Sequence, residues 1–199
     1  MTVEKNNNLY RLIAKRRSIR IFKQKKVPSA LVKKAINAAR LAPSAANLQF
    51  LEYLIVNDKN LCNKIFPLIR WAGYLYPKRQ PLWKQRPTLY VIILANKEKS
   101  KKFDLRDIGA AAENIILTLL SQGVGSCWIA SIKRSSLRKI LSIPSKYEID
   151  SLIAAGYPKE SPKLEQNPVE VKYWLDKKKR LHVPKRPLGD IFHCNTITF

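Results

Sequence analysis

Most of the chain alternates between segments with the apolar spacing of a helix and short, nearly continuous apolar runs. Because residues three and four apart share one helix face, the spacing predicts helices over residues 9–17, 28–42, 60–69, 104–123 and 135–142. The apolar runs predict strands over residues 50–57, 88–96, 125–131 and 151–157. Only some connections are long enough for parallel pairing. The order therefore predicts an α+β fold, with a mixed or mostly antiparallel central sheet flanked by helices.

Proline and glycine set the predicted ends of two helices. Pro28 suits the first position of the second helix, and Pro43 disfavours helical geometry at Ala42, where that helix is expected to end. Gly123 is expected to end the longest helix. The same turn divides the uncharged run 114–132 into a helix, a turn and a strand, so we predict no transmembrane segment there.

Two segments lack a clear period. Residues 70–87 contain three prolines, two tryptophans and several cations, which predicts a long loop or lid. Residues 159–186 are charged, with VKYW as the one apolar island. A segment this polar is not expected to have a core of its own. We predict a single domain over residues 1–199, in which 159–199 form a polar arm that wraps another surface, such as that of a partner subunit.

The net charge of the chain indicates that it attracts anions but does not indicate which class of anion it binds. The 199 residues suit one domain and carry a formal net charge of +24, from 38 Lys and Arg against 14 Asp and Glu. Such a charge attracts nucleotides, phosphates, nucleic acid or acidic membranes, or it reflects a compositional bias toward lysine. The cations are dispersed and no nucleic-acid-binding motif is present, so nucleic-acid binding is not expected to be the main role.

The cysteines and the N-terminal residues predict a cytoplasmic protein. Cys62, Cys127 and Cys194 are widely separated and odd in number, with neither metal-ligand spacing nor a disulfide framework. This usage is typical of a reducing compartment. The first 17 residues lack the apolar core of a signal peptide.

The common catalytic signatures are absent from the chain. It contains no G-x-G-x-x-G, no G-x-x-x-x-G-K-[ST] and no G-x-S-x-G motif. His182 and His193 have no nearby ligand set, so no metal site is predicted. Nothing supports a Cys–His nucleophile pair. If the protein is an enzyme, its chemistry is expected to belong to a bound cofactor.

The segment RRSIRIF, residues 16–22, is the first candidate for holding such a cofactor. In an extended conformation Arg16, Ser18 and Arg20 would lie on one side, with Arg17 facing elsewhere. Two guanidinium groups and a hydroxyl on one side suit a phosphate monoester. The alternative is a helix end whose cations offset the helix dipole. Spacing alone does not decide between these two interpretations.

Two further segments carry polar groups suited to a cofactor. APSAANLQF, residues 42–50, forms a polar bend that offers backbone donors and amide side chains to a planar heterocycle, or is an ordinary loop. PKRP, residues 184–187, is a second group of cations that could contact the cofactor. The alternative is a solvated cluster of charges on the surface.

Five segments in this order resemble the FMN-dependent nitroreductase family: RRSIRIF, VPSALVKKAINAARLAPSAANLQF, DIGAAAENIILTLLSQGVGSCWIASI, IPSKYEIDSLIAAGYPKE and VPKRPLGDIF. The resemblance runs from about Tyr10 to Phe192. It implies a nitroreductase-like α/β sandwich and a homodimer with FMN in two equivalent sites at the subunit interface. Because chain ends are exchanged between subunits in this family, the C-terminal arm is expected to extend onto the dimer partner.

The resemblance also implies which residues bind FMN. These are Arg16, Arg17, Ser18 and Arg20 at the phosphate and ribityl chain; Pro43, Ser44, Ala45, Asn47 and Gln49 in a loop from the partner subunit; Cys127, Trp128, Ile129 and Ala130 beside the isoalloxazine ring; and Lys185 and Arg186 at the phosphate. Phe50 departs from the family pattern, which often has proline there, and Lys185 replaces the usual arginine. Lysine lacks the bidentate fork, so which of Lys185 and Arg186 holds the phosphate stays open.

The implied activity is that of an FMN-dependent NAD(P)H oxidoreductase that reduces nitroaromatic, quinone or similar acceptors. One site would serve NADH or NADPH and then the acceptor, in a ping-pong hydride transfer, so no catalytic side chain is expected. Trp71 and Tyr74 are candidates for stacking on an aromatic acceptor, with local packing as the alternative. Flavin fragmentation, dehalogenation and oxidation of peptide-derived heterocycles, also performed on this fold, stay open.

Overall fold

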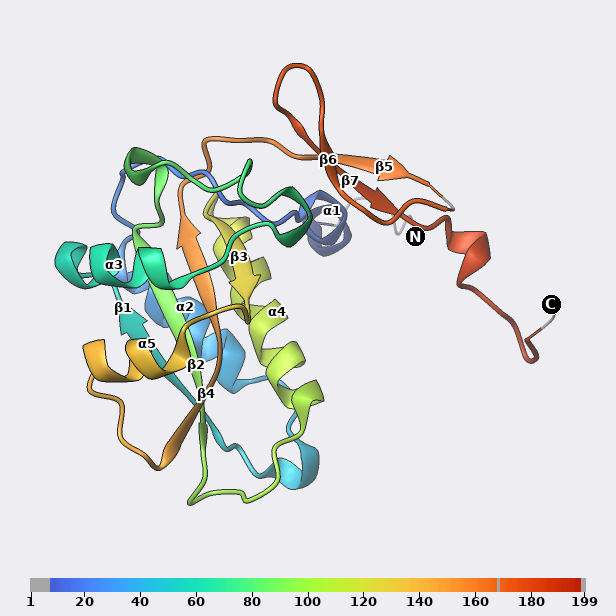
Figure 1. Cartoon of the computed structure of the whole chain (residues 1–199). Helices are drawn as coiled ribbons and strands as arrows, with labels where there is room; N and C mark the ends of the chain where they lie inside the picture. Colours follow the sequence, from blue (N-terminus) through green and yellow to red (C-terminus); the bar gives the residue numbers. More distant parts are fainter. Residues whose placement is uncertain (1–7, 168, 198–199) are drawn as a thin grey trace.

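The computed structural model describes residues 8–167 and 169–197. At its centre lies a four-stranded sheet in the order β1-β2-β4-β3 (Figure 1). The strands are β1 (Leu51–Val56), β2 (Leu89–Asn96), β3 (Gly125–Ile129) and β4 (Tyr147–Gly156). Each neighbouring pair is antiparallel, which confirms the predicted α+β fold with a mostly antiparallel sheet.

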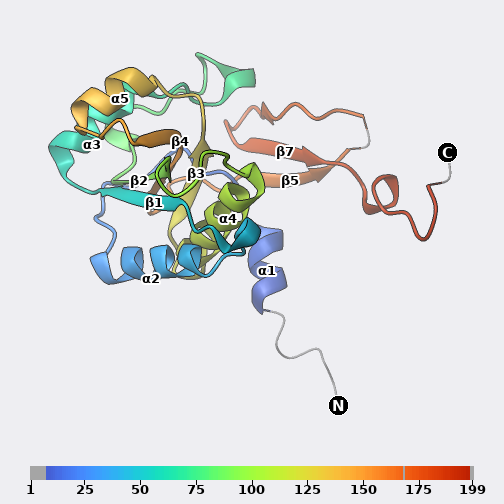
Figure 2. The ribbon, with the colours of Figure 1, turned by 90° about the horizontal axis from the view of Figure 1, so that it is seen from below.

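Helices cover both faces of this sheet. One face is covered by α2 (Ser29–Arg40) and α4 (Leu105–Ser121), the other by α3 (Lys59–Ile65) and α5 (Arg134–Ile140) (Figure 2). Since successive strand residues point to opposite faces, Val91 and Ile93 pack toward α2 and α4, whereas Tyr90 and Ile92 pack toward α3 and α5. β2 is therefore buried along its whole length. A further helix, α1 (Asn8–Lys15), contacts α4.

The helix ends follow the proline and glycine signals to within two residues. Pro28 is the N-cap of α2 instead of its first residue, and the helix ends at Arg40, before Ala42. Gly123 follows the end of α4 with φ +73°, a conformation that glycine adopts without strain. Short 3₁₀ turns occupy Ala45–Asn47, Phe66–Leu68, Gly73–Leu75, Trp83–Gln85 and Leu188–Asp190.

Strand β4 begins four residues earlier than its apolar run predicts. Residues 147–149 pair with the end of β2, beyond a register shift at Ile93 and Leu94 that leaves Asp150 without a partner on β2. Only Ile149 among these four residues is buried, so the segment carries no apolar run. Its strand conformation is determined by the pairing with β2, which the sequence pattern does not reveal.

Residues 163–185 form a second sheet, in the order β5-β7-β6. Its strands are β5 (Lys163–Gln166), β6 (Trp174–Leu175) and β7 (Leu181–Lys185). Leu181 is buried, and the His182 ring lies 2.8 Å from a Glu165 oxygen and 3.1 Å from an Asp176 oxygen. A buried leucine and a polar network hold three short strands together, which the sequence pattern did not predict. Among the described residues, neither hydrophobic cluster includes this segment, so the expectation that it lacks a core of its own is not contradicted. The sheet projects away from the body (Figures 1 and 2). Residue 168 and both ends of the predicted 1–199 domain lie outside the described residues.

Gly125, the first residue of β3, allows residues 16–22 to approach the sheet. A Cβ at Gly125 would lie 2.7 Å from Cγ1 of the buried Ile19. We expect Gly125→Ala to lower the free energy of unfolding by about 1–3 kcal/mol, because neither atom has room to move. Urea denaturation measures this change.

The matched control is Gly109→Ala within α4. A Cβ at Gly109 would meet nothing within 4 Å. Alanine there is expected to raise the free energy of unfolding by about 0.5–1 kcal/mol, because glycine is a poor residue for a helix interior. If Gly125→Ala were as stable as Gly109→Ala, the close approach of Ile19 to β3 would be contradicted.

Candidate functional site

Residues 16–22 run as an extended segment beside β3, at the edge of the central sheet. Ser18 forms a parallel bridge with Ser126, whose carbonyl oxygen accepts a hydrogen bond from the Ile19 N–H at 2.8 Å. Phe22 forms a second bridge, with Pro158 after β4. Because α1 ends at Lys15, the segment is extended, and the alternative of a helix end does not describe it.

Glu160, which sequence reasoning missed, holds this segment in place. Its Oε1 accepts hydrogen bonds from the backbone N–H groups of Arg20 at 2.5 Å and Ile21 at 2.9 Å. Its Oε2 pairs with Arg79 from the 70–87 segment, and only about a tenth of either side chain is exposed. One buried carboxylate thus joins three distant parts of the chain. In the sequence, Glu160 is only a single acidic residue just after a predicted strand, and such a residue does not by itself indicate which groups it contacts.

The three arginines of this segment differ in how far their charge is neutralised. Arg16 Nε lies 3.3 Å from Glu113 Oε1 of α4. Arg17 donates to the Arg16 carbonyl oxygen, and its buried Nε has no hydrogen-bond partner among the described residues. The Arg20 guanidinium lies 5.3 Å from the centre of the Tyr173 ring, and within the described part of the chain no carboxylate comes within 4.0 Å of its nitrogens. An orphaned guanidinium nitrogen and an unneutralised arginine fit an anion such as a phosphate group.

The thiol of Cys127 is buried in β3, next to the Ser126 that bridges to Ser18. Burial raises the pKa of Cys127, and Arg20, Ser18 and Arg16 each act on that pKa in the opposite direction. That these three side chains share one side of the extended segment stays a prediction from its alternation. The thiol stays protonated near neutral pH, so it is not available as a nucleophile.

The four β3 residues predicted to lie beside a flavin ring alternate in exposure. Cys127 and Ile129 are buried in the core beneath α3 and α5. Trp128 is 43% exposed, and its Nε1 donates to Ser151 Oγ at 2.7 Å. Ala130, just beyond the strand, is exposed as well. Trp128 and Ala130 therefore form the accessible side of this strand.

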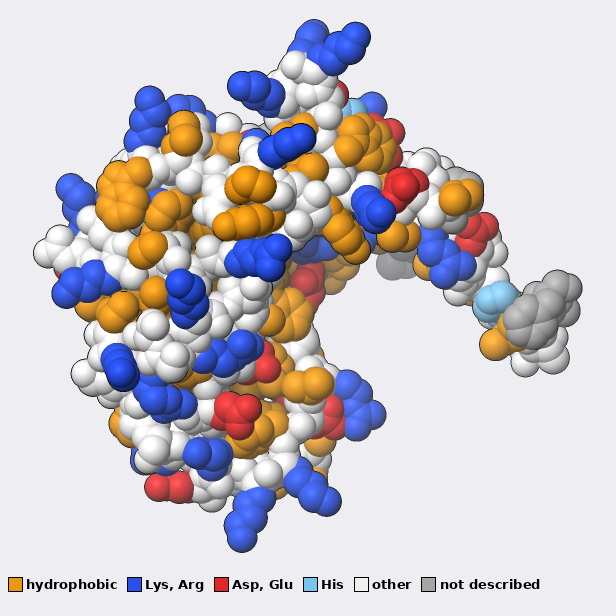
Figure 3. Space-filling model, viewed as in Figure 1, with side chains coloured by type: hydrophobic (Ala, Val, Ile, Leu, Met, Phe, Trp, Pro, Cys, Tyr) orange, Lys and Arg blue, Asp and Glu red, His pale blue; other side chains and the backbone are white. Residues whose placement is uncertain are grey.

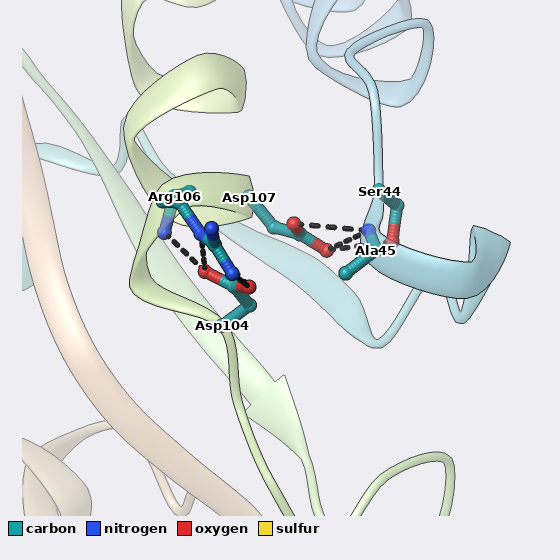
Figure 4. Close-up of polar contacts among 5 residues, drawn as sticks. All are labelled: Ser44, Ala45, Asp104, Arg106 and Asp107. Carbon is teal, nitrogen blue, oxygen red and sulfur yellow. Dashed lines mark hydrogen bonds and ion pairs between the residues drawn. The ribbon is translucent and has the colours of Figure 1, made fainter.

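The loop between α2 and β1 is fixed by Asp107, a buried residue in the first turn of α4. Its carboxylate accepts hydrogen bonds from Ser44 Oγ at 2.7 Å and from the Ala45 N–H at 3.0 Å (Figure 4). Ser44 Oγ in turn accepts from the Gln49 N–H at 3.0 Å. Pro43, Ala45, Asn47 and Gln49 are exposed. Sequence reasoning missed Asp107, because it assigned the start of α4 only to helix formation.

Replacing Asp107 by asparagine is expected to destabilise this loop. The amide NH₂ would face either the Ser44 hydroxyl or the Ala45 N–H, leaving a buried donor without an acceptor. We expect the free energy of unfolding to fall by about 1–3 kcal/mol. Urea denaturation measures the change, with Asp104→Asn as the matched control.

Asp104 is the N-cap of α4, where asparagine serves nearly as well as aspartate. The control is therefore expected to change stability by less than about 0.5 kcal/mol. Equal effects of the two substitutions would mean that Asp107 does not anchor the loop.

The loop lies at the first turn of α4, whereas Arg16 reaches Glu113 in the middle of the helix and Ser18 lies beside β3, which follows its end. The 17 residues of this helix span about 25 Å, with Asp107 in the first turn and β3 following the last. Figure 1 shows the chain after α2 at the lower end of α4 and the chain after α1 at the upper end. One chain therefore does not place Ser44 beside Ser18 and Arg20.

Lys185 and Arg186 are also separated from the arginine segment. The Lys185 carbonyl oxygen accepts from the Asn167 N–H at 3.0 Å, and Arg186 donates to the Asp190 carbonyl oxygen at 2.5 Å. Both contacts lie within the projecting arm (Figure 2). Among the described hydrogen bonds and ion pairs, none joins these cations to residues 16–20.

The two predicted acceptor-stacking residues differ sharply in burial. Trp71 is 1% exposed and packs near Phe66, with ring centroids 6.1 Å apart. It therefore has no free face for an acceptor, and the structure places it in local packing because the 70–87 segment folds onto the sheet. Tyr74 is 60% exposed and lies 5.0 Å from the Tyr173 ring.

The described residues offer neither a metal cluster nor a membrane span. They contain no group of three or more His, Cys, Asp or Glu side chains arranged to hold a metal ion. None of their helices combines the length and the apolar character needed to cross a membrane.

Comparison with known families and proteins gives a consistent result. The profile of the Nitroreductase family matches residues 13–157. A provisionally named NADH dehydrogenase/NAD(P)H nitroreductase of Archaeoglobus fulgidus is 30% identical, over 75% of this chain and 85% of its own length. An iodotyrosine deiodinase of Thermotoga neapolitana is 28% identical, over 83% of this chain and 97% of its own length.

The solved structures agree with this result. An FMN-dependent nitroreductase of Clostridium difficile superposes with a TM-score of 0.67 and 28% identity, covering 94% of this chain and 98% of that one. The family match covers well over half of the chain and includes both the arginine segment and the 43–49 loop. The chain therefore belongs to the nitroreductase family, and it is an oxidoreductase of that family of FMN-binding flavoproteins.

Proposed function

We propose that the protein is an FMN-dependent NAD(P)H oxidoreductase that reduces nitroaromatic, quinone or similar acceptors in a ping-pong reaction. The observation that carries the proposal is the Arg20 guanidinium beside Ser18 at the edge of β3, without a carboxylate partner within 4.0 Å among the described residues. The names of relatives such as the Archaeoglobus protein support nicotinamide as the reductant. When bound, FMN supplies the hydride acceptance and electron transfer.

The residues of this chain would bind and orient that cofactor. Ser18 and Arg20 would hold the phosphate by hydrogen bonds, Arg16 would join them by leaving Glu113, and Arg17, on the other side of the segment, would support it from behind. The exposed side of β3 at Trp128 and Ala130 would border the ring, with Cys127 and Ile129 supporting it from the core. Tyr74 is the remaining candidate for contact with an aromatic acceptor.

We further propose a homodimer in which each FMN site takes residues from both chains. The separation of the 43–49 loop from the arginine segment along α4 supports this proposal. The partner would supply Pro43, Ser44, Ala45, Asn47 and Gln49, and the arm would bring Lys185 or Arg186.

The chain would form a single domain with residues 159–199 as the arm. The three free cysteines support a cytoplasmic location.

The visible spectrum of the purified protein tests the cofactor. We expect yellow protein that bleaches anaerobically with NADH or NADPH and regains its colour when a nitroaromatic or quinone is added. Titration with each nicotinamide establishes which one is preferred. Colourless protein that takes up no added FMN would overturn the proposal.

Mixing two variants with impaired sites tests whether the site is shared. Arg20→Ala damages the phosphate segment and Asp107→Asn the loop, so each homodimer is expected to have impaired sites. In a mixed dimer, one site carries both changes and the other carries neither. Subunit exchange between the variants is therefore expected to restore about half of the activity per mixed dimer. No recovery after verified exchange would show that both elements act within one chain.

Reductive dehalogenation is a second candidate function. The Thermotoga relative that is matched over 97% of its length is named an iodotyrosine deiodinase, and this observation favours dehalogenation among the alternatives. Anaerobic assays with iodotyrosine, a nitroaromatic and a quinone separate the two candidates. Release of iodide faster than reduction of either other acceptor would favour the second.

Nucleic-acid binding receives no support from the distribution of charge. Figure 3 shows Lys and Arg side chains spread over the face in view, without one continuous basic patch. Electrostatic binding to duplex DNA is strongest at low salt. If the protein did not bind duplex DNA at low salt, this alternative would be excluded.

A further inference from the structure

A cavity lies away from every residue assigned to the flavin site. It has a volume of about 450 Å³ and opens between α3, residues 83–88 and residues 24–26. Its polar lining combines amide side chains with cations: Gln24, Asn57, Asn63, Lys26, Lys59, Lys84 and Arg86. No acidic residue is part of the lining. The volume falls within the range of small-molecule sites in proteins.

Arg86 is the most unusual group in this cavity, because it is a buried cation with neutral partners. It is 8% exposed. Its Nε donates to Asn63 Oδ1 at 2.6 Å, and its Nη1 donates to the Trp83 carbonyl oxygen at 2.7 Å. Within the described part of the chain, no carboxylate lies within 4.0 Å of it. A buried charge is normally paired, so an anion in the cavity would supply the missing counter-charge.

The surroundings of Arg86 do not supply that counter-charge. Burial raises the pKa of Cys62 to about 11, so this lining thiol is neutral at physiological pH. The buried hydroxyl of Tyr90, which lies near Cys62 and Arg86, has no hydrogen-bond partner among the described residues, and burial raises its pKa as well. The nearby carboxylate of Asp58 caps α3 by accepting from the Leu61 N–H at 2.8 Å.

Trp83 gives the cavity an aromatic wall. The Arg86 guanidinium lies 4.8 Å from the centre of this ring, and Phe66 contacts it edge-on at 5.7 Å. The side chain nevertheless remains 53% exposed. A flat ring can therefore pack against the accessible part of the indole while a charged group reaches Arg86.

We propose that this cavity binds a nucleoside phosphate or a similar phosphorylated aromatic anion. The phosphate lies at Arg86, Lys59 and Lys84 stand around the opening, and the ring packs on Trp83. The site is separate from the flavin, since no residue assigned to FMN lines it. It also gives part of the net positive charge a specific role.

Calorimetric titration of the FMN-loaded protein with adenosine 5′-monophosphate at low salt tests the proposal. We expect one binding event per chain. The double variant Lys59→Gln/Lys84→Gln is expected to weaken it at least tenfold. The matched control, Lys33→Gln/Lys34→Gln, removes the same charge from the exposed face of α2 and is expected to change it less than twofold. Both variants should retain FMN and nitroreductase activity, because neither touches the proposed flavin site.

Two simpler probes separate the contributions of phosphate and ring. Trp83→Leu is expected to weaken binding of adenosine 5′-monophosphate several-fold while leaving binding of inorganic phosphate unchanged. Adenosine without phosphate is expected not to bind measurably. Equal weakening in the two lysine double variants would overturn the site, because it would mark a general effect of net charge. Failure of adenosine 5′-monophosphate to bind the wild-type protein at millimolar concentration would also overturn it.

Discussion

Replacing Arg20 by alanine is expected to weaken FMN binding about 10- to 100-fold while leaving the fold intact. A hydrogen bond to a charged group contributes about 1.5–3 kcal/mol, which corresponds to that range. Glu160 binds the backbone N–H of Arg20 and not its side chain, so the segment keeps its anchor in the variant. The guanidinium has no carboxylate partner among the described residues whose loss would disturb the fold.

Fluorescence titration with FMN measures this change, and Lys34→Ala is the control. Lys34 is an exposed cation on α2, so its removal lowers the net charge equally without reaching the segment. Circular dichroism and a thermal midpoint near that of the wild type would verify folding. Unchanged FMN affinity in Arg20→Ala would mean that this arginine belongs to the general basic surface.

Removing the carboxylate of Glu160 is expected to have the largest effect on stability. Glu160→Ala leaves the buried Arg79 without its counter-charge and two backbone N–H groups without an acceptor. Breaking a buried ion pair by deleting one partner costs about 3–5 kcal/mol. For a chain of this size, such a loss lowers the thermal midpoint by about 6–20 °C. FMN retention is expected to fall as well, because residues 16–22 lose their anchor.

Two comparison variants make the Glu160 result specific. Glu98→Ala breaks the exposed pair with Lys146 and is expected to cost less than about 1 kcal/mol. Adding Arg79→Met to Glu160→Ala is expected to recover part of the lost stability, because the double variant no longer contains the buried, unpaired charge of Arg79. A Glu160→Ala protein as stable as Glu98→Ala would show that the buried pair is unimportant.

The sequence by itself determined the order and type of the main elements. Apolar spacing located the five helices and the four strands of the central sheet, because each element buries one face or two against the core. It also singled out the arginine segment, which is extended, as the predicted alternation of Arg16, Ser18 and Arg20 requires.

Only the tertiary structure revealed the contacts that fix this site. Glu160 binds a backbone N–H 140 positions away, and Asp107 binds the loop 62 and 63 positions before it. One acid that accepts hydrogen bonds from distant backbone groups leaves no periodic pattern. The small sheet of the arm and the start of β4 escaped prediction for a similar reason: their strands are determined by pairing and polar contacts, not by apolar runs. Burial also depends on how loops fold back, so the structure alone placed Trp71 in the core and left Arg86 as a buried cation with neutral partners.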